Sequence, residues 1–354
     1  MAQWNKYERT AARSPGHAGR DIRPSSLTFD VHSHVAIPQA AAYVAPHLDM
    51  TTIPLAHFAS PESKALGQKQ ESDIRARITG YDDRLKDLEA MGLDMQLVMP
   101  PPNQCYYTVP LDIAVRASQM VNDGLAEYVG KMPDRFVPIG TVPLQDGNEA
   151  ARELERSMTT LGFKGAEILT NVAGNEISDA AYAPFWKKAE ELGALIVLHP
   201  NGFTEGRRLS RYYFNNVIGN PFDTTLALHY LIFDGVLERH PGLKILAVHG
   251  GGYLAAYSGR IDHAWGARSD SHGDLPHPPT SYLKKVYFDT VVFTPHQLRN
   301  LIEVFGADHI LMGTDYPFDM AEFDPIGHLA SVDTLDAPTI AAIAGGNAKR
   351  LLGI

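Results

Sequence analysis

The sequence is poor in cysteine and in long apolar runs. Cys105 is the single cysteine among 354 residues, so no disulfide can form within the chain. A core of this size needs no disulfide, and a lone thiol suits a reducing compartment, so we expect a cytoplasmic protein. No apolar run reaches the ~18 residues of a membrane span, and residues 1–20 lack the apolar core of a secretory signal. We therefore expect no membrane partner.

The chain also lacks blocks of positive charge. It has 31 Lys and Arg against 41 Asp and Glu, a formal net charge of −10. Such a balance argues against nucleic acid or an anionic membrane as the main partner. Hydrophobic residues make up 44% and charged residues 20%, which excludes a disordered, collagen-like or coiled-coil chain. The composition predicts a globular protein.

Eight short apolar runs of β-strand character recur along the chain. Helical patterns fill most of the intervals between them, and several of these patterns end at a glycine. Alternating buried strands and helices indicate a parallel sheet, and eight such units favour an α/β fold of the (β/α)₈ TIM-barrel type. No GxGxxG follows the first run, which weakens the dinucleotide-binding alternative. The predicted strands are Leu27–Val31, Met95–Met99, Arg135–Gly140, Phe163–Ile168, Ala194–Leu198, Leu243–Val248, Lys285–Asp289 and His309–Gly313.

Three connections are too long to be plain loops. We expect residues 1–26 to form an N-terminal arm and residues 27–354 a single catalytic domain. Loops as long as 35–78, 200–222 and 266–284 usually act as lids or interface elements in compact domains. Residues 35–78 follow the first strand, so we expect them to form a lid or small inserted subdomain at the mouth of the barrel.

Polar residues follow several of the predicted strands at the point where each ends. His32 and His34 end the first strand, and alternate residues of a strand face the same way, which places Asp30 in their register. His199, His249 and Asp315 follow later strands. Active-site groups of such barrels come from the C-terminal ends of different strands. These residues therefore predict a metal site.

The ligands and the catalytic group can be separated in two ways. His32, His34, His199 and Asp315 can hold one ion, which leaves His249 as the general base that activates metal-bound water. In the alternative, His249 is itself a ligand. Three imidazoles and a carboxylate suit zinc, with manganese as a second possibility. Asp289, at the end of the seventh strand, is expected to be a hydrogen-bond partner or a strand-end cap.

Longer motifs run in order through the chain and carry a resemblance to a known family. They are FDVHSH, RLKDLEAMGLDMQLV, RFVPIGTVPLQD, LIVLHP, GVLERHPGLKILAVHGGGYL, GRIDHAW, VYFDTVVF and LMGTDYPFDM. The chain resembles the amidohydrolase superfamily, in the branch of metal-dependent decarboxylases related to 2-amino-3-carboxymuconate-6-semialdehyde decarboxylase. The resemblance covers the chain from about residue 29 to its end and implies a distorted barrel with one divalent ion, usually zinc.

The resemblance also assigns roles to particular residues. It implies the same four metal ligands and His249 as the residue that activates water, with Asp315 sharing in catalysis. Arg84 corresponds to an arginine that holds the substrate carboxylate, and Phe318 to an aromatic residue of the substrate pocket. Arg260 corresponds to an arginine donated across a homodimer interface. A substrate-side lysine of the family is missing here, and Arg75 or Arg77 lies in its neighbourhood.

These observations predict a metal-dependent, non-oxidative decarboxylase of a small unsaturated or aromatic carboxylic acid. The alternative on the same site is a hydrolase or hydratase that opens a lactone or amide, or adds water to a dienoate. A third class is a catalytically silent metal-binding scaffold, against which the intact His249 argues. The step that releases CO₂ is inferred by analogy with the family.

Overall fold

The structure is a computed structural model that describes residues 18–354. The first part of the predicted arm, residues 1–17, lies outside the described residues. The remainder begins with the short helix α1 (Ala18–Asp21), and the backbone N–H of Gly19 donates a hydrogen bond of 2.8 Å to Asp324. Arg23 forms an ion pair of 2.7 Å with Asp94. This end of the described chain is therefore held against the domain.

All eight predicted strands are present and parallel. Their ladder order is β1-β2-β3 in one sheet and β11-β10-β9-β8-β5-β4 in the other. A separate antiparallel pair, β6 and β7, forms a small hairpin at Asn171–Val172 and Asn175–Glu176. The barrel strands are β1 (Phe29–His34), β2 (Met95–Met99), β3 (Phe136–Pro138), β4 (Gly140–Thr141), β5 (Gly165–Leu169), β8 (Leu195–His199), β9 (Lys244–Ala247), β10 (Tyr287–Asp289) and β11 (Ile310–Leu311).

The two sheets join into one ring at both of their seams. Only Ile139 separates β3 from β4, so these two form one interrupted strand. At the other seam, Val31 N–H donates to Met312 O at 2.9 Å, and His34 N–H donates to Tyr316 O at 2.8 Å. The predicted (β/α)₈ barrel is therefore confirmed, with short and irregular strands.

Alternate strand residues fill the interior of the barrel. Phe29, Val31, Val197 and Val248 belong to one small apolar cluster within the ring. Residues of the opposite parity, such as Ile196, pack in a larger cluster with the surrounding helices. Strands buried on both faces explain why the sequence shows continuous apolar runs rather than an alternating pattern.

A β-bulge in β1 changes which residues face the interior. The pairing of β1 with β2 shifts between Asp30 and Ser33, where two residues of β1, Val31 and His32, stand against Leu97 of β2. Phe29 and Val31 face inward before the bulge, and His32 and His34 belong to the site after it. Asp30 instead bonds to Gln96 of β2 and to Thr314 of the loop after β11. The expectation that Asp30 shares the register of the two histidines is therefore wrong.

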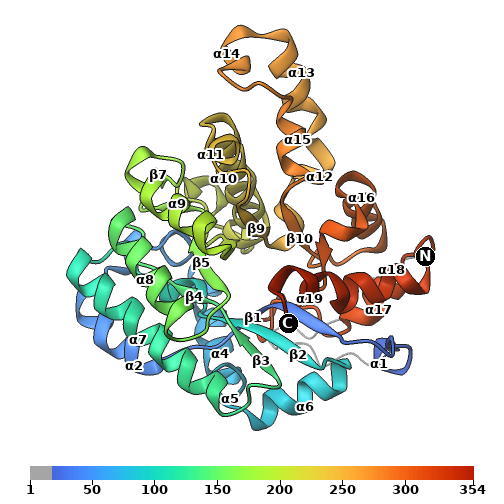
Figure 1. The fold of residues 1–354 in the computed structure, drawn as a ribbon. Helices are drawn as coiled ribbons and strands as arrows, with labels where there is room; N and C mark the ends of the chain where they lie inside the picture. The colour runs from blue at the N-terminus through green and yellow to red at the C-terminus, as the bar shows by residue number, and fades with distance from the viewer. Residues whose placement is uncertain (1–17) are drawn as a thin grey trace.

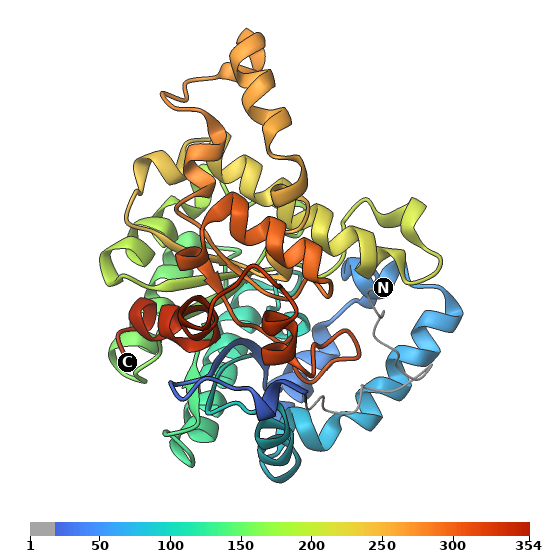
Figure 2. The ribbon, with the colours of Figure 1, turned by 90° about the vertical axis from the view of Figure 1, so that its right-hand side faces the viewer.

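Helices surround the ring, as Figure 1 and the turned view in Figure 2 show. The described helices, apart from α1 and the short 3₁₀ and π turns, are α2 (Pro38–Val44), α3 (Pro54–His57), α4 (Pro61–Asp73), α5 (Arg75–Thr79), α6 (Asp82–Met91), α7 (Leu111–Gly130), α8 (Gly147–Thr159), α9 (Ala183–Leu192), α10 (Asn220–Phe233), α11 (Val236–Arg239), α12 (Leu254–Tyr257), α13 (Gly259–Ala267), α14 (Ser269–His272), α15 (Pro279–Leu283), α16 (Pro295–Phe305), α17 (Pro325–Ala330), α18 (Ala337–Ala341) and α19 (Asn347–Leu352). Within residues 18–354, none of these helices has the length and apolarity needed to cross a membrane.

The insertion after β1 is helical and contacts the loop after β8. It holds α2 to α5, which leave β1 at the end that carries His34. The backbone N–H of Leu55 donates to Asn201 O at 3.3 Å, and Asn215 donates from its side chain to Pro54 O at 2.9 Å. Asn201 lies two residues beyond His199, so these bonds tie the insertion to a segment that leaves the site.

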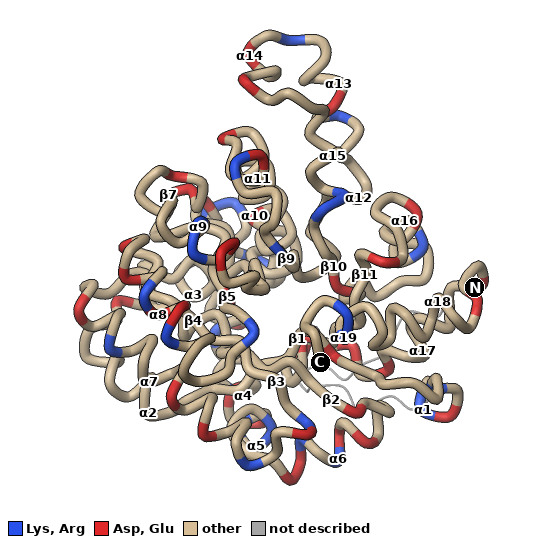
Figure 3. The backbone as a smooth tube through the Cα atoms, viewed as in Figure 1, with Lys and Arg blue, Asp and Glu red and all other residues tan. Residues whose placement is uncertain are grey.

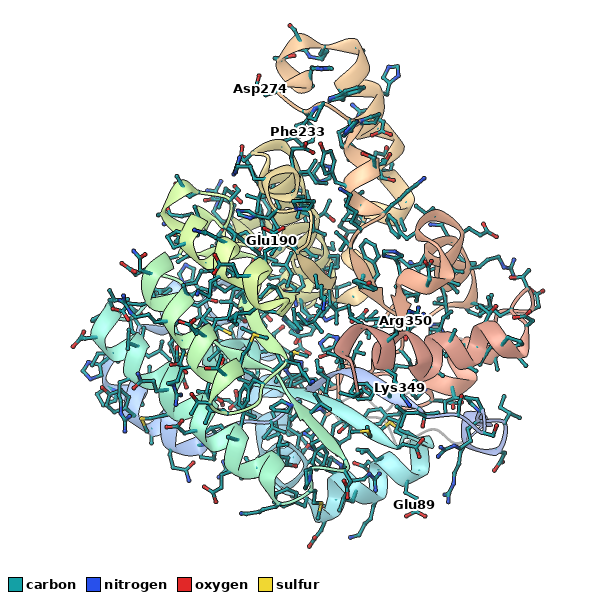
Figure 4. The ribbon with its side chains drawn as sticks, viewed as in Figure 1. Glu89, Glu190, Phe233, Asp274, Lys349 and Arg350 are labelled. Atoms are coloured by element: carbon teal, nitrogen blue, oxygen red, sulfur yellow. The ribbon has the colours of Figure 1, made fainter. Side chains whose placement is uncertain are left out.

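A second excursion projects from the body of the domain. Helices α13 and α14 form an arm beyond α12 and α15 (Figures 1 and 2), and neither α13 nor α14 contains a buried residue. Figure 4 places Asp274 on this arm, away from the barrel. Figure 3 shows Lys and Arg interspersed with Asp and Glu along the chain, the arm included. The arm is too exposed to be held by a core of its own.

A buried carboxyl group on α10 predicts a pH-dependent stability. Burial raises the pKa of Asp223 to about 6, although Thr170 and Asn171 donate hydrogen bonds to it. A folded-state pKa above the unfolded value gives stability that is full below about pH 4 and is lost as pH rises through 6. Relative to Asp223→Asn, the wild-type chain should lose on the order of 3 kcal/mol of unfolding free energy from pH 4 to pH 8.

Urea unfolding of both chains across this pH range checks the prediction. A constant difference between the two chains would contradict it.

Candidate metal centre

Four buried side-chain atoms converge at one end of the barrel without hydrogen-bond partners. They are Nε2 of His32, His34 and His199 and Oδ1 of Asp315, and within residues 18–354 no hydrogen bond from outside this group reaches any of them. Asp315 Oδ1 lies 3.4 Å from His32 Nε2 and 3.3 Å from His34 Nε2. Buried polar atoms without partners are rare in native proteins. These four atoms belong to the residues that the sequence predicts as ligands, and together they present a donor set suited to a divalent ion.

The other nitrogen of each of these three rings is already bound. His32 Nδ1 lies 2.7 Å from Asp289 Oδ2, and His34 Nδ1 lies 3.0 Å from Pro100 O. His199 Nδ1 lies 2.7 Å from Pro200 O. Because each Nδ1–H donates a hydrogen bond to an oxygen, the neutral ring has its free lone pair on Nε2. This arrangement is the one that histidine ligands of metals commonly show.

Asp289 acts as the expected hydrogen-bond partner. One carboxylate oxygen bonds to His32, and the other accepts from the backbone N–H groups of Gly250 at 2.8 Å and Val291 at 3.1 Å. The carboxyl group is fully buried, which raises its pKa, but these bonds and the histidines outweigh burial and lower it. A charged Asp289 thus orients His32 and also holds the turn after His249.

Asp315 has an unusual backbone and an electrostatic environment that favours its charge. Its φ is 64°, which a non-glycine residue rarely adopts. Burial raises its pKa, but His32, His249 and His34 together hold it well below the usual value. Burial lowers the pKa of His199 well below its usual range, and His249 and the other rings lower it further. The centre thus combines an ionised carboxylate with a neutral imidazole at His199.

His249 differs from the other three histidines. Its Nδ1 is buried with no bond from any residue between 18 and 354, and its Nε2 lies 3.6 Å from Asp315 Oδ2. Its ring centroid is 5.0 Å from that of His199 and 5.2 Å from that of His32. Possible ligand atoms of His32, His199, His249 and Asp315 all lie within 4.8 Å of one another. The geometry therefore allows both roles considered for His249.

The residues expected to touch the substrate are spread over the molecule. Phe318 lies at the centre, with its ring centroid 5.1 Å from that of His34. Arg84 is fully buried, and its guanidinium donates to protein groups that include Gln96 and the carbonyl of His34. Arg260 is exposed on α13 of the projecting arm. Of these three, only Phe318 has its side chain against the ring of one of the predicted ligands.

Two further side chains near the centre escaped the sequence analysis. Glu167 lies on the interior face of β5, fully buried, with one oxygen 3.9 Å from Cys105 Sγ. Burial raises its pKa well above the usual value, and Cys105 and Asp315 also act on it. Tyr213 has a φ of 63° and a pKa raised first by burial and then by Asp319 and Asp315. An acid within an apolar strand was a visible signal for Glu167, whereas nothing in the sequence marks the backbone of Tyr213.

Comparison with known proteins identifies the family. The model of the amidohydrolase family matches residues 30–354. The chain belongs to this family. It is 30% identical to 2-amino-3-carboxymuconate-6-semialdehyde decarboxylase of Dictyostelium discoideum, over 93% of this chain and 92% of the relative. It is also 30% identical to gamma-resorcylate decarboxylase of Rhizobium radiobacter, over 83% of this chain and 95% of the relative. The predicted family is confirmed.

A solved structure agrees with the fold. The 5-carboxyvanillate decarboxylase of Novosphingobium aromaticivorans, complexed with manganese and 4-hydroxy-3-methoxy-5-nitrobenzoic acid, superposes with a TM-score of 0.81. The alignment covers 93% of this chain and 97% of that one at 22% identity. The likeness supports the barrel architecture.

Substitutions at the centre should distinguish the metal ligands from His249. His32→Ala, His34→Ala and Asp315→Ala each remove one of the atoms that lack a partner, so each should lose most bound metal. His249→Ala should keep much of the metal and lose nearly all turnover, because the other four donors remain. Elemental analysis of the purified variants, with circular dichroism to check folding, measures this. A His249→Ala chain as empty of metal as the other three would make His249 a ligand.

Proposed function

We propose that this chain is a metal-dependent, non-oxidative decarboxylase of a small unsaturated or aromatic carboxylic acid. The relatives compared above are decarboxylases of one or the other kind. The observation that carries the proposal is the convergence of three imidazole nitrogens and one carboxylate oxygen, all buried and with no hydrogen bond from elsewhere in the described part of the chain. The chemistry of this set of atoms fits a divalent ion.

We assign the metal to His32, His34, His199 and Asp315. Three imidazoles with one carboxylate suit zinc, whereas manganese is the ion in the related 5-carboxyvanillate decarboxylase structure. A divalent ion bound by these residues would stabilise the negative charge that develops on the substrate. Zinc is the ion we propose, with manganese as its alternative.

Two side chains of the chain itself take part in the proposed reaction: His249 delivers a proton, and Phe318 contacts the substrate. When CO₂ leaves, the bond between the carboxyl carbon and its neighbour breaks, and the remaining electron pair takes up a proton. We assign delivery of this proton to His249 Nε2, because this nitrogen lies 3.6 Å from Asp315 Oδ2 and the side chain is 16% exposed. Phe318, beside His34, offers an apolar face to an unsaturated or aromatic acid.

Product analysis tests the activity directly. Incubated with gamma-resorcylate, 5-carboxyvanillate and related unsaturated acids, the metal-loaded chain should release one CO₂ per acid consumed. A chelator should abolish this release and leave the circular dichroism spectrum largely unchanged, because the apolar core does not depend on the ion. Readdition of zinc or manganese should restore turnover. Consumption of substrate with gain of water and no CO₂ would instead indicate a hydrolase or hydratase, and full activity without metal would overturn the proposal.

We further propose a homodimer in which Arg260 acts on the partner's active site. Several large apolar side chains are exposed around α10 and α12, at the base of the arm that carries Arg260. Val217 is 47%, Phe222 42% and Tyr257 68% exposed. A second copy would bury this surface, and a twofold axis would bring each arm towards the other mouth. Arg260 is exposed on α13, so its side chain is accessible to a second copy.

Mixing two inactive variants tests this arrangement. Arg260→Ala and His249→Ala chains, each inactive alone, should recover up to about a quarter of wild-type activity after subunit exchange. About half of the dimers are then mixed, and each has one complete site of two. Exchange confirmed by mass labelling without recovery of activity would place Arg260 in its own subunit, or outside catalysis.

We also propose a cytoplasmic location. Cys105 is free and buried, so the chain requires no oxidising compartment to complete its fold. Fractionation of cells that express the chain without a fused tag checks this location.

A further inference from the structure

A single buried guanidinium touches two of the segments that carry metal ligands. Arg84 lies on α6 with no exposed surface. Its Nη2 donates to the carbonyl oxygen of His34. Its guanidinium carbon also lies 4.8 Å from the centre of the Tyr316 ring, and Tyr316 directly follows Asp315. One side chain thus contacts the end of β1 and the loop after β11, which lie on either side of the barrel seam.

The same guanidinium is linked to a third predicted ligand, His32, through the side chains of Gln96 and Asp30. Arg84 Nη1 donates to Gln96 Oε1 at 2.9 Å, and Gln96 Nε2 donates to Asp30 Oδ2 at 2.8 Å. Asp30 Oδ1 in turn accepts from the backbone N–H groups of His32 and Thr314, both at 3.0 Å. Thr314 precedes Asp315. The chain Arg84–Gln96–Asp30 therefore holds the backbone at His32 and beside Asp315.

The buried charge of Arg84 also lacks a carboxylate partner. Within residues 18–354 no carboxylate forms an ion pair with it, because the nearby Asp87 pairs with Arg77 at 2.7 Å. Its remaining Nε donates to Arg77 O at 3.2 Å. Removing a charge from water without an opposite charge is costly. Each of its three nitrogens already donates to a protein oxygen, including the Ser33 hydroxyl at 3.4 Å, so a substrate carboxylate would have to compete with these bonds.

We propose that Arg84 is a positioning residue of the metal centre, which fixes His34 and Asp315, rather than a residue that holds the substrate carboxylate. This inference rests on the proposed metal site. It replaces the role that the family resemblance implied for this position. Arg84 acts on the ligands through their backbone and through Tyr316, so its loss should loosen metal binding before it changes substrate affinity.

Arg84→Met and Arg84→Lys test the inference, with Arg135→Met as the matched control. Arg135 also donates to two backbone carbonyls, those of Leu93 and Asp94. These residues precede β2, at the end of the strand away from the metal centre. Titration of metal-free protein with Co²⁺, followed by visible absorption, reports affinity and ligand geometry without any turnover. Both Arg84 variants should bind Co²⁺ about tenfold to a hundredfold more weakly with an altered spectrum, as loss of groups that orient metal ligands does elsewhere. Arg135→Met should lower stability alone.

A second variant covers the case in which Arg84→Met does not fold. Gln96→Leu cuts the link to Asp30 and leaves Arg84 in place, and it should weaken Co²⁺ binding in the same direction. Unchanged Co²⁺ affinity and spectrum in the folded variants, together with a raised KM and an unchanged kcat, would overturn the inference and restore the role in substrate binding. A wild-type chain that binds no Co²⁺ would overturn the proposed function itself.

Discussion

The carboxylate of Asp30 joins the first and last strands of the barrel, and the metal centre depends on this junction. It accepts from the backbone of His32 and Thr314, from the Thr314 hydroxyl at 2.6 Å and from Gln96. The barrel seam is therefore closed by one buried acid as well as by backbone bonds. Burial raises the pKa of Asp30 to about 6, although Thr314, His32 and Gln96 oppose this shift. The ligands of β1 and of the loop after β11 can converge because this junction fixes both segments.

The sequence could predict the barrel and the converging side chains because both rest on short-range patterns. Each of the eight apolar runs became a barrel strand, and Met95–Met99 matches its predicted bounds. Parallel strands of one ring share a common C-terminal end, so polar residues such as His199 and Asp315 had to meet there. Burial of the apolar residues before them leaves few other places for these side chains.

The sequence could not predict the direction in which some individual side chains point. Alternation predicts that Asp30 points with His32, but one extra residue in β1 turns Asp30 towards Gln96 and Thr314. In the same way, nothing in the sequence around Arg84 indicates that its side chain is buried and donates to the carbonyl oxygen of His34. Glu167 on β5 lies in an apolar run that predicted only a strand. The three cases share one cause, because side-chain direction depends on register and tertiary contact.

The central claim is that the centre binds one divalent ion through three histidines and one aspartate, with His249 free to carry a proton. A crystal structure of the metal-loaded chain, with anomalous scattering recorded at the metal edge, tests this claim most directly. The account predicts one peak per chain within about 2.0–2.2 Å of Nε2 of His32, His34 and His199 and of an oxygen of Asp315. A peak bound to His249 in place of one of these residues, or no peak at the convergence of the four atoms, would contradict it.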